Sequence, residues 1–556
     1  FAVSGCVTGP ASQATPGAQT TTSPAAPKSI TIAFPLDPNS LGGSLTGGNQ
    51  AAVVPSRYFR EFDNAYLTTY NQQDETNPWL VTQVPSLDDG TWKVLDNGGM
   101  EVTWKLRPGI KWQDGTDLTS DDLVYSWDVQ HDPITQIGNA SIARLVSEVR
   151  TPDSLTAVFV WPQASQLGNL AGVREFDVLP RHLLASVDHP ALIDHPYFQD
   201  PSVFVGAGPY RPTAWDHGRS VTLEAFNNYF LGRPKIDKVT FSTIGDYQTA
   251  LVNVLSGQVD VGYWAISYEG ARILQQEWAN NGGGTVEMQA NNARFFFPQL
   301  RPEYATPTDL TDVRVRQAIM YAMDRRELAE TAAAGAAQVI NSTTYPDSAL
   351  GRVVETKAPQ YAYDPTRATA LFTEAGWRPG ADGILTKGGD RFQLPYRLAS
   401  NNASADQALL FPVLQQQLRK VGVDLVSVLA TLNDQQADAT FPGLAFTGLP
   451  DNQAGFLTRF ATVNIASPQN RWTGNNRDGY SNPVFDQMVQ KVDVTLRLEE
   501  RMQLWAEANR VIVDDVGFMP LYNYPYPYVV RKNVVGALPG DPINPPSYFV
   551  HLWDVQ

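Results

Sequence analysis

The chain has 556 residues and a formal net charge of −16 at pH 7, from 41 Lys and Arg against 57 Asp and Glu. This length predicts three or four packing units, and the acidic balance argues against a nucleic-acid partner, because phosphate binding needs a dense basic face. Hydrophobic residues make up 43% of the chain, enough for sizeable cores, yet no window reaches the roughly 18 uncharged apolar residues of a membrane-spanning helix, and a single cysteine excludes intrachain disulfides.

The only cysteine, Cys6, follows the small residues Val3-Ser4-Gly5. This pattern resembles a bacterial lipoprotein signal, in which a peptidase cuts before the cysteine and the thiol is acylated. The alternative is an ordinary surface cysteine. Residues 7–27 carry no charge and little to bury, so they are typical of a flexible tether. We therefore expect residues 1–27 to hold the protein, by a lipid on Cys6, at the extracytoplasmic face of a bacterial membrane.

Alternation of polar and apolar residues predicts strands along the rest of the chain. The first is Ser29–Phe34, and the glycine-rich segment 41–50 follows it. The other predicted strands are residues 101–106, 155–161, 220–225, 238–244 and 423–430.

Helices are predicted where a capping residue precedes an apolar stripe. Asp312 is the expected cap of one helix over residues 313–334, and Asp364-Pro365 begins another that ends at Gly376. Because helices and strands interleave, the sequence predicts an α/β or mixed α+β fold. Further predicted helices cover residues 407–421, a segment from Asn482-Pro483, and residues 498–513.

Sequence motifs for catalysis are missing. The chain has no G-x-S-x-G elbow, no H-E-x-x-H and no Walker loop. Gly206-Ala207-Gly208 is followed by Pro209, which does not open a dinucleotide-binding helix. Asp188-His189 and Asp194-His195 could supply metal ligands, but they are more typical of surface loops. We therefore expect no enzyme, no cofactor and no metal site.

Residues 104–127 form the most specific motif of the chain. They combine a strand, a Pro108-Gly109 turn, an Asp114-Gly115 hairpin, and a helix opened by the capping box of Thr119 and Asp122. This block resembles the signature of the large extracellular solute-binding proteins of ABC importers, family 5, which includes oligopeptide- and dipeptide-binding proteins. Further segments that match the family lie at residues 206–210, 256–260, 312–318, 363–377, 480–483 and 520–522.

The resemblance implies a two-lobed, periplasmic-binding-protein-like clamp with an extra domain on the first lobe. The two places where the chain crosses between lobes would form a hinge. The implied function is a monomeric receptor that binds oligopeptides in the interlobe cleft and delivers them to the membrane subunits of an ABC permease. The implied parts are lobe I at residues 28–66, 198–289 and 518–556, extra domain II at residues 67–197, and lobe II (domain III) at residues 290–517.

Peptide-binding members carry an aspartate in a loop of lobe II, and this aspartate pairs with the amino terminus of the peptide. In the matching segment 446–457, Leu449 takes that position and Asp451 follows two residues later. The arginine of some oligopeptide binders is also absent, with Gly443 near its place. Because a buried ammonium needs a carboxylate partner, two alternatives stay open: a sugar or other neutral solute as ligand, or a regulatory or scaffolding lipoprotein without transport. The candidate ligand-binding residues are Gly47, Gly48, Asn49, Asp451, Asn452, Trp472, Asn475, Tyr522 and Tyr524.

Overall fold

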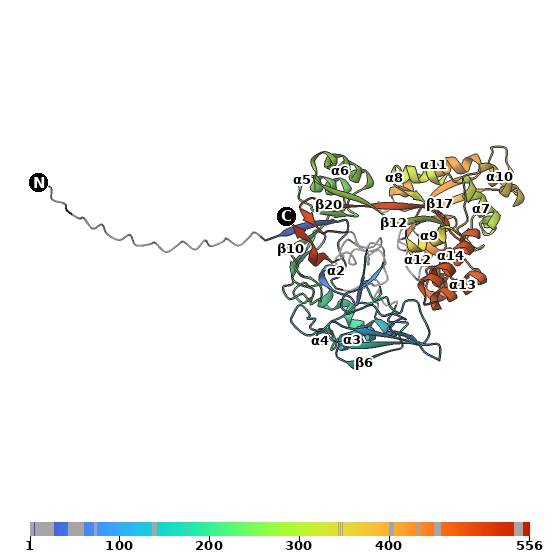
Figure 1. Ribbon diagram of the computed structural model, residues 1–556. Helices are drawn as coiled ribbons and strands as arrows, with labels where there is room; N and C mark the ends of the chain where they lie inside the picture. Colours follow the sequence, from blue (N-terminus) through green and yellow to red (C-terminus); the bar gives the residue numbers. More distant parts are fainter. Residues whose placement is uncertain are drawn as a thin grey trace.

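Two lobes share one long sheet in the computed structural model, and a third unit lies below the first lobe (Figure 1). We use the names lobe I, domain II and lobe II for these parts; the boundaries given above stay predictions. The expected mixed α/β fold is confirmed. The structure describes residues 5, 27–42, 60–71, 75–135, 142–173, 175–342, 344, 346, 348–399, 405–430, 434–449, 457–538 and 549–556.

The long sheet runs through both lobes in the order β18-β17-β19-β12-β20-β11-β1-β10-β9-β8, and β13 pairs with β20 beside this path. Its first strand, β1, is parallel to both β10 and β11. The bounds are β1 Ser29–Phe34, β8 Tyr210–Asp216, β9 Ser220–Ala225, β10 Lys238–Thr243, β11 Val261–Tyr263, β12 Gly284–Pro298, β13 Gln338–Val339, β17 Gln393–Ala399, β18 Asp424–Ala430, β19 Leu444–Leu449 and β20 Met519–Arg531.

Strands β12 and β20 carry the chain between the lobes. They pair antiparallel from Gly284 opposite Arg531 to Phe296 opposite Met519. The register shifts twice, between Ala290 and Asn292 and again at Arg294. Such bulges bend and twist a strand pair locally. The two crossings of the chain are therefore one irregular ribbon at the middle of the sheet.

Lobe I covers its part of the sheet with two helices, α5 (Tyr247–Ser256) and α6 (Tyr268–Asn281). Asp246 and Ser267 cap their first turns by accepting backbone N–H groups, and each helix ends at a glycine in the left-handed region. Lobe I also contains the four-residue helix α2 (Arg60–Asp63) and the small two-stranded sheet of β21 (Val534–Val535) with β22 (Asp554–Val555).

Domain II contains a four-stranded sheet in the order β4-β5-β7-β6. Helix α3 packs on β6 and β7, and its start shows the expected capping box: Asp122 accepts the N–H of Thr119 at 2.9 Å. The bounds are β2 Thr68–Tyr70, β3 Thr76–Pro78, β4 Trp92–Val94, β5 Met100–Lys105, α3 Ser120–His131, β6 Glu148–Asp153, β7 Thr156–Trp161 and α4 Arg181–Leu184.

Lobe II is mostly helical around its end of the sheet. The single helix expected over residues 313–334 is wrong: the chain forms α7 (Val313–Ala322) and α8 (Arg325–Ala333). Asp324 accepts the N–H groups of Arg326 and Glu327, so it caps a new helix. The other helices are α9 Ala349–Glu355, α10 Pro365–Glu374, α11 Ala405–Lys420, α12 Gln435–Ala439, α13 Pro483–Val494 and α14 Leu498–Asp514, and a small sheet joins β14 Arg378–Pro379, β15 Leu385–Lys387 and β16 Asp390–Arg391.

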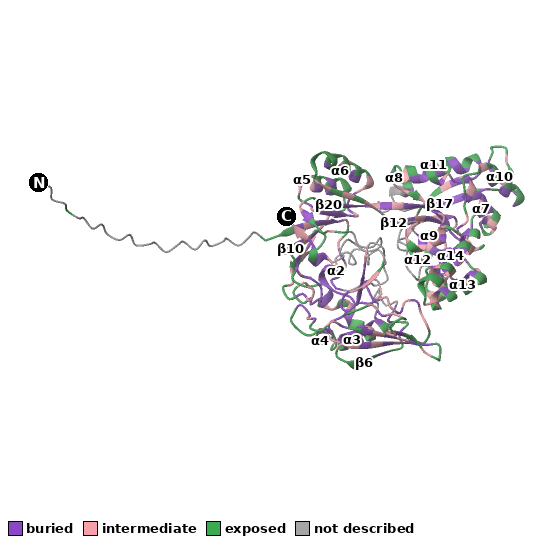
Figure 2. Cartoon of the chain, in the orientation of Figure 1, coloured by how far each residue is buried: buried purple, intermediate pink, exposed green. Residues whose placement is uncertain are grey.

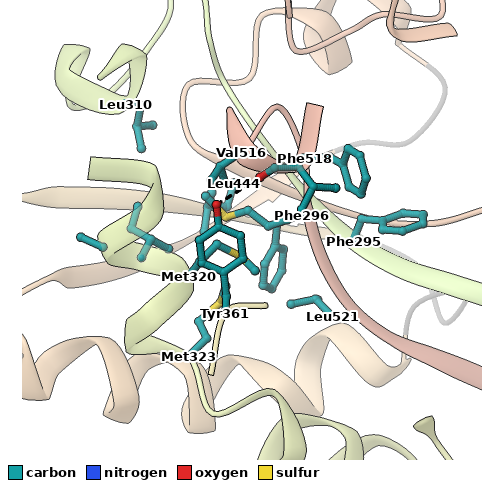
Figure 3. Packing of buried hydrophobic residues seen from close by; sticks show 14 of the residues in the cluster. Phe295, Phe296, Leu310, Met320, Met323, Tyr361, Leu444, Val516, Phe518 and Leu521 are labelled. Atoms are coloured by element: carbon teal, nitrogen blue, oxygen red, sulfur yellow. Dashed lines mark hydrogen bonds between the residues drawn. The ribbon is translucent and has the colours of Figure 1, made fainter. Parts of the chain in front are cut away.

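The core of lobe II forms where these helices meet the sheet. Phe296 of β12 and Leu521 of β20 pack with Met320 of α7 and with Tyr361, all buried (Figure 3). Across the molecule, buried residues concentrate in the sheets while the outer faces of the helices are exposed (Figure 2). In the described part of the chain, no helix is long and apolar enough to cross a membrane.

A buried glutamine ties domain II to lobe I. The side chain of Gln113 donates to the carbonyls of Gly208 and Tyr210 at 3.1 and 2.8 Å and accepts the N–H of Gly206 at 3.1 Å. A Cβ on Gly206 would lie 1.9 Å from the backbone oxygen of Asp63, so only glycine fits. Tyr125 and Val129 of α3 also belong to the hydrophobic cluster of lobe I. Buried hydrogen bonds and a shared hydrophobic cluster therefore join domain II to lobe I.

Candidate ligand-binding site

Four tyrosines of β20 alternate along the strand and so lie on one face of it. Tyr522 is 0% exposed within the core cluster of lobe II, and Tyr528 is 1% exposed within that of lobe I. Tyr524 and Tyr526 lie between them and are only partly buried. This strand face is thus buried in the core of lobe II at one end and in the core of lobe I at the other, and it is partly exposed in between. This open stretch marks the place between the lobes.

Other aromatic rings gather around the same stretch. The ring of Trp264 lies 5.0 Å from that of Tyr526, and the ring of Tyr526 lies 5.5 Å from that of Tyr524. Trp264 has a φ of 57°, in a left-handed region that is uncommon for a bulky residue and costs about 1–2 kcal/mol. Such strain is typical of ligand-binding sites. These rings come from β20 and from the segment directly after β11.

A positive charge lies within this aromatic row. Arg294 of β12 places its guanidinium carbon 5.2 Å from the ring centroid of Tyr524 and 5.7 Å from that of Phe446. One of its nitrogens is 3.5 Å from the Tyr526 hydroxyl. A guanidinium over aromatic faces is a cation–π arrangement that keeps its N–H donors directed. The row can therefore bind flat groups such as peptide planes and can neutralise a ligand carboxylate.

The loop of residues 471–480 holds two of the predicted residues. Trp472 is partly buried and has a φ of 62°, directly after Arg471 at 53°. Asn475 is exposed, whereas its neighbour Asn476 is buried and organises the loop: it donates to Phe460, Ala461 and Tyr480 and accepts from Gly479 and Tyr480. The backbone N–H of Trp472 itself bonds to the carbonyl of Ser467 at 2.8 Å.

The structure places the predicted ligand-binding residues in different settings. Tyr524 belongs to the aromatic row, and Tyr522 is a core residue of lobe II. Trp472 and Asn475 lie in the separate loop described above, and their binding role stays a prediction. The predicted residues outside the described part of the chain are Gly47, Gly48, Asn49, Asp451, Asn452 and the lipidation candidate Cys6.

Two consecutive residues bond to Gly42, near the start of the glycine-rich segment. Asp63 accepts the N–H of Gly42 at 3.1 Å, and the amide of Asn64 donates to the Gly42 carbonyl at the same distance. Burial raises the pKa of the Asp63 carboxyl well above its ordinary value, although the Gly42 hydrogen bond acts in the opposite direction. A short helix of lobe I thus sets where this segment begins.

The site contains three residues that the sequence reasoning missed: Trp264, Arg294 and Tyr526. A signal for them exists. Tyrosines at every second position of residues 522–528 indicate one strand face, and a lone arginine within the apolar run 293–297 indicates a charge beside it. What the sequence does not give is the point at which that face leaves the core.

His189 and His195, the two histidines considered as metal ligands, contact different residues and not each other. His189 pairs with Asp132 at 2.8 Å, and His195 accepts the N–H of Tyr197 at 3.2 Å. Among the residues that the structure describes, no group of three or more His, Cys, Asp or Glu could hold a metal ion.

Residues 77–456 match the family model of the bacterial extracellular solute-binding proteins, family 5. The chain is 26% identical over 336 residues to the oligopeptide-binding protein AppA of Bacillus subtilis, covering 60% of this chain and 59% of AppA. It is 24% identical over 454 residues to the glutathione-binding protein GsiB of Escherichia coli, covering 80% of this chain and 81% of GsiB.

The fold has a close counterpart among solved structures. The oligopeptide-binding protein of Thermus thermophilus, solved with a pentapeptide, superposes with a TM-score of 0.76. It shares 21% sequence identity, over 95% of this chain and 96% of that one. At this identity the likeness concerns the fold.

Proposed function

Because the chain belongs to the bacterial extracellular solute-binding proteins of family 5, we propose that it binds oligopeptides between its two lobes and delivers them to the membrane subunits of an ABC permease. Relatives that bind oligopeptides and glutathione support a peptide ligand. These relatives are receptors and not enzymes. The lobe boundaries given under the sequence analysis are part of this proposal.

One observation carries the peptide assignment: the aromatic row of Trp264, Tyr524 and Tyr526 with Arg294 lies between two hydrophobic cores. A peptide offers flat amide planes that stack on such rings and a terminal carboxylate that a guanidinium binds. Ligand recognition by a few aromatic side chains with a few polar groups is the ordinary composition of a small-molecule site.

The mechanism is closure of a clamp. Lobe I with domain II forms one body, lobe II forms the other, and the bulged β12–β20 ribbon joins them. A ligand that contacts both bodies binds the closed state more tightly than the open one, and this difference in affinity shifts the population toward closure. No bond of the ligand is made or broken.

Native mass spectrometry tests the ligand. Protein purified without denaturation is expected to carry a mixture of peptide masses, and the same sample after unfolding, dialysis and refolding should show the bare mass. A peptide library should then raise the unfolding temperature of the refolded protein. A single bare mass from the start, with no temperature rise from any peptide, would contradict the proposal.

A second candidate ligand, a sugar or other neutral solute, is favoured by one feature of the sequence: Leu449 at the position where peptide binders carry an aspartate. The same mass measurement separates the two, because a carbohydrate mass in place of peptide masses would support it. Absence of any ligand and of any thermal response would support the regulatory or scaffolding alternative.

We also propose that a lipid on Cys6 anchors the protein to the outer face of the membrane, with residues 7–27 as tether. The support is the Val3-Ser4-Gly5-Cys6 pattern and the uncharged composition of the tether. Expressed with its own signal, the Cys6→Ala variant should move to the soluble fraction while Ser23→Ala, within the tether, stays in the membrane fraction. Retention of Cys6→Ala in the membrane would contradict the anchor.

A further inference from the structure

Domain II and lobe II touch at a point away from the ribbon that joins the lobes. The backbone N–H of Gln166 donates to the carbonyl of Asp493 at 2.8 Å, and the Gln166 side-chain amide donates to the Asp493 carboxylate at 3.0 Å. Gln166 is 2% exposed although it sits in a turn. These two residues are 327 positions apart in the chain.

Both sides of the contact are anchored in their own unit. The turn that carries Gln166 follows β7, where the N–H of Ala164 bonds to the carbonyl of Gly98 at 3.0 Å. Across the contact, Asp493 is in the last turn of α13, and Arg501 donates to the carbonyls of Thr495 and Leu496 that follow. Relative motion of the two units must therefore break the contact instead of stretching a loop.

Helix physics explains why this contact stabilises closure. The last four carbonyls of an α-helix have no partner within the helix. The Asp493 carbonyl of α13 receives its hydrogen bond from the opposite unit. Leu496, just beyond this helix, packs against the hydrophobic cluster of domain II. Opening would expose that apolar contact and leave the carbonyl and the carboxylate to water.

The contact is also joined to the loop expected to bind ligand. The Thr458 hydroxyl lies 3.5 Å from both carboxylate oxygens of Asp493, and Thr458 directly follows the segment 446–457. Burial raises the pKa of the Asp493 carboxyl, while the hydrogen bonds from Gln166 and Thr458 act against this rise. The same carboxylate therefore contacts domain II and the base of that segment.

We propose that Gln166 and Asp493 are positioning residues that latch domain II to lobe II, and that they set ligand affinity by stabilising the closed state without touching the ligand. This inference rests on the proposed clamp function. In terms of population, a latch that favours the closed state slows ligand release, because the ligand leaves from the open state.

The test exchanges the donor and the acceptor of the side-chain hydrogen bond between Gln166 and Asp493. Gln166→Glu places two carboxylates face to face, so we expect a larger open population and a rate of ligand release raised roughly tenfold. Asp493→Asn alone keeps an oxygen that accepts from Gln166, so its release rate should change by no more than about threefold. In the double variant, the amide introduced at position 493 would donate to the carboxylate introduced at position 166, and we expect release to return toward the wild-type rate. Gln163→Glu, at an exposed position three residues before Gln166, is the matched control.

The open population is measured without ligand, by electron–electron distance spectroscopy. Spin labels at Val94→Cys in domain II and Val463→Cys in lobe II, both exposed, are placed in a Cys6→Ala background. Longer distances in Gln166→Glu, reversed in the double variant, support the latch. Unchanged distances in Gln166→Glu, or no reversal, overturn it. Because this measurement needs no ligand, it decides the latch even if the peptide assignment fails, and unchanged release of a bound peptide overturns the latch alone.

Discussion

The guanidinium carbon of Arg294 lies 5.2 Å from the centre of the Tyr524 ring, and the two residues come from the two strands that join the lobes. The register between β12 and β20 shifts on both sides of this pair, between Ala290 and Asn292 and between Arg294 and Phe295. The pair therefore lies where the ribbon is irregular. A charge held over rings at such a point is well placed to sense both a ligand and the angle between the lobes.

Replacing Arg294 by Met keeps an unbranched stem and removes the cation. We expect the affinity for a peptide with a free carboxyl terminus to fall roughly tenfold, because one charge-assisted hydrogen bond is lost, while an amidated peptide is affected less. Titration calorimetry with both peptides measures this. Arg272→Met, at an exposed position of α6, is the control and should bind like the wild type. Equal losses for both peptides would contradict a carboxylate partner.

Truncation of two tyrosines on the same strand face should affect different properties, stability in one case and ligand binding in the other. Tyr522→Ala opens a cavity in the core of lobe II, so we expect the free energy of unfolding to fall by about 3–5 kcal/mol. Tyr524→Ala should lower the free energy of unfolding much less but weaken ligand binding roughly tenfold, as loss of an aromatic contact does. Urea unfolding and calorimetry on both variants check this. A strong stability loss in Tyr524→Ala would place it in the core instead.

Local signals in the sequence predicted the secondary structure well. The strands Ser29–Phe34 and Ser220–Ala225 are confirmed to the residue, because alternation is strong there. The helix expected over 313–334 failed because Ala, Met and Leu continue the apolar stripe past the break. In the structure, Asp324 caps a second helix by accepting the N–H groups of Arg326 and Glu327. The sequence signal for this break is an aspartate, a common capping residue, inside an apolar stripe.

The candidate site was harder to predict, because its residues depend on long-range placement. In the loop 471–480, Asn475 and Asn476 look alike in the sequence. Burial and five hydrogen bonds assign the structural role to Asn476, and neither can be read from residue type. The sequence likewise does not show that Trp264, which directly follows β11, meets Tyr526 of β20. The antiparallel pairing of β11 with β20 decides the second case, whereas contacts of the loop with residues 460 and 461 decide the first.

The glycines of the motif at residues 206–210 should be intolerant of a side chain. Gly206→Ala would bring its Cβ to 1.9 Å from the backbone oxygen of Asp63, so we expect a loss of about 3 kcal/mol or more in the free energy of unfolding, from forced backbone shifts. In Gly245→Ala the Cβ would meet only the Pro35 oxygen, at 3.5 Å, an ordinary contact. Urea unfolding of both variants decides, and equal stabilities would contradict the packing argument.

Burial of His551 should make the protein less stable in mild acid. Burial, with a smaller effect of Lys235, lowers the pKa of His551 from 6.5 to about 4. Below pH 6.5 the imidazole of His551 therefore binds a proton in the unfolded chain, whereas in the folded chain it binds one only below about pH 4. The contribution of this group to stability is complete above pH 6.5 and is lost as the pH falls toward 4, by about 3 kcal/mol.

The measurement compares urea unfolding of the wild type with that of His551→Gln at pH 7 and pH 4. Other groups titrate in both proteins, so their effects cancel in the difference. We expect the wild type to lose about 3 kcal/mol more than the variant between the two pH values. His217→Gln, at a histidine whose side chain is 64% exposed, should lose as much as the wild type. The expected loss arises because the imidazole of His551 takes up a proton in the unfolded chain and not in the folded one. If His551→Gln, which lacks this imidazole, loses as much stability in acid as the wild type, the prediction is wrong.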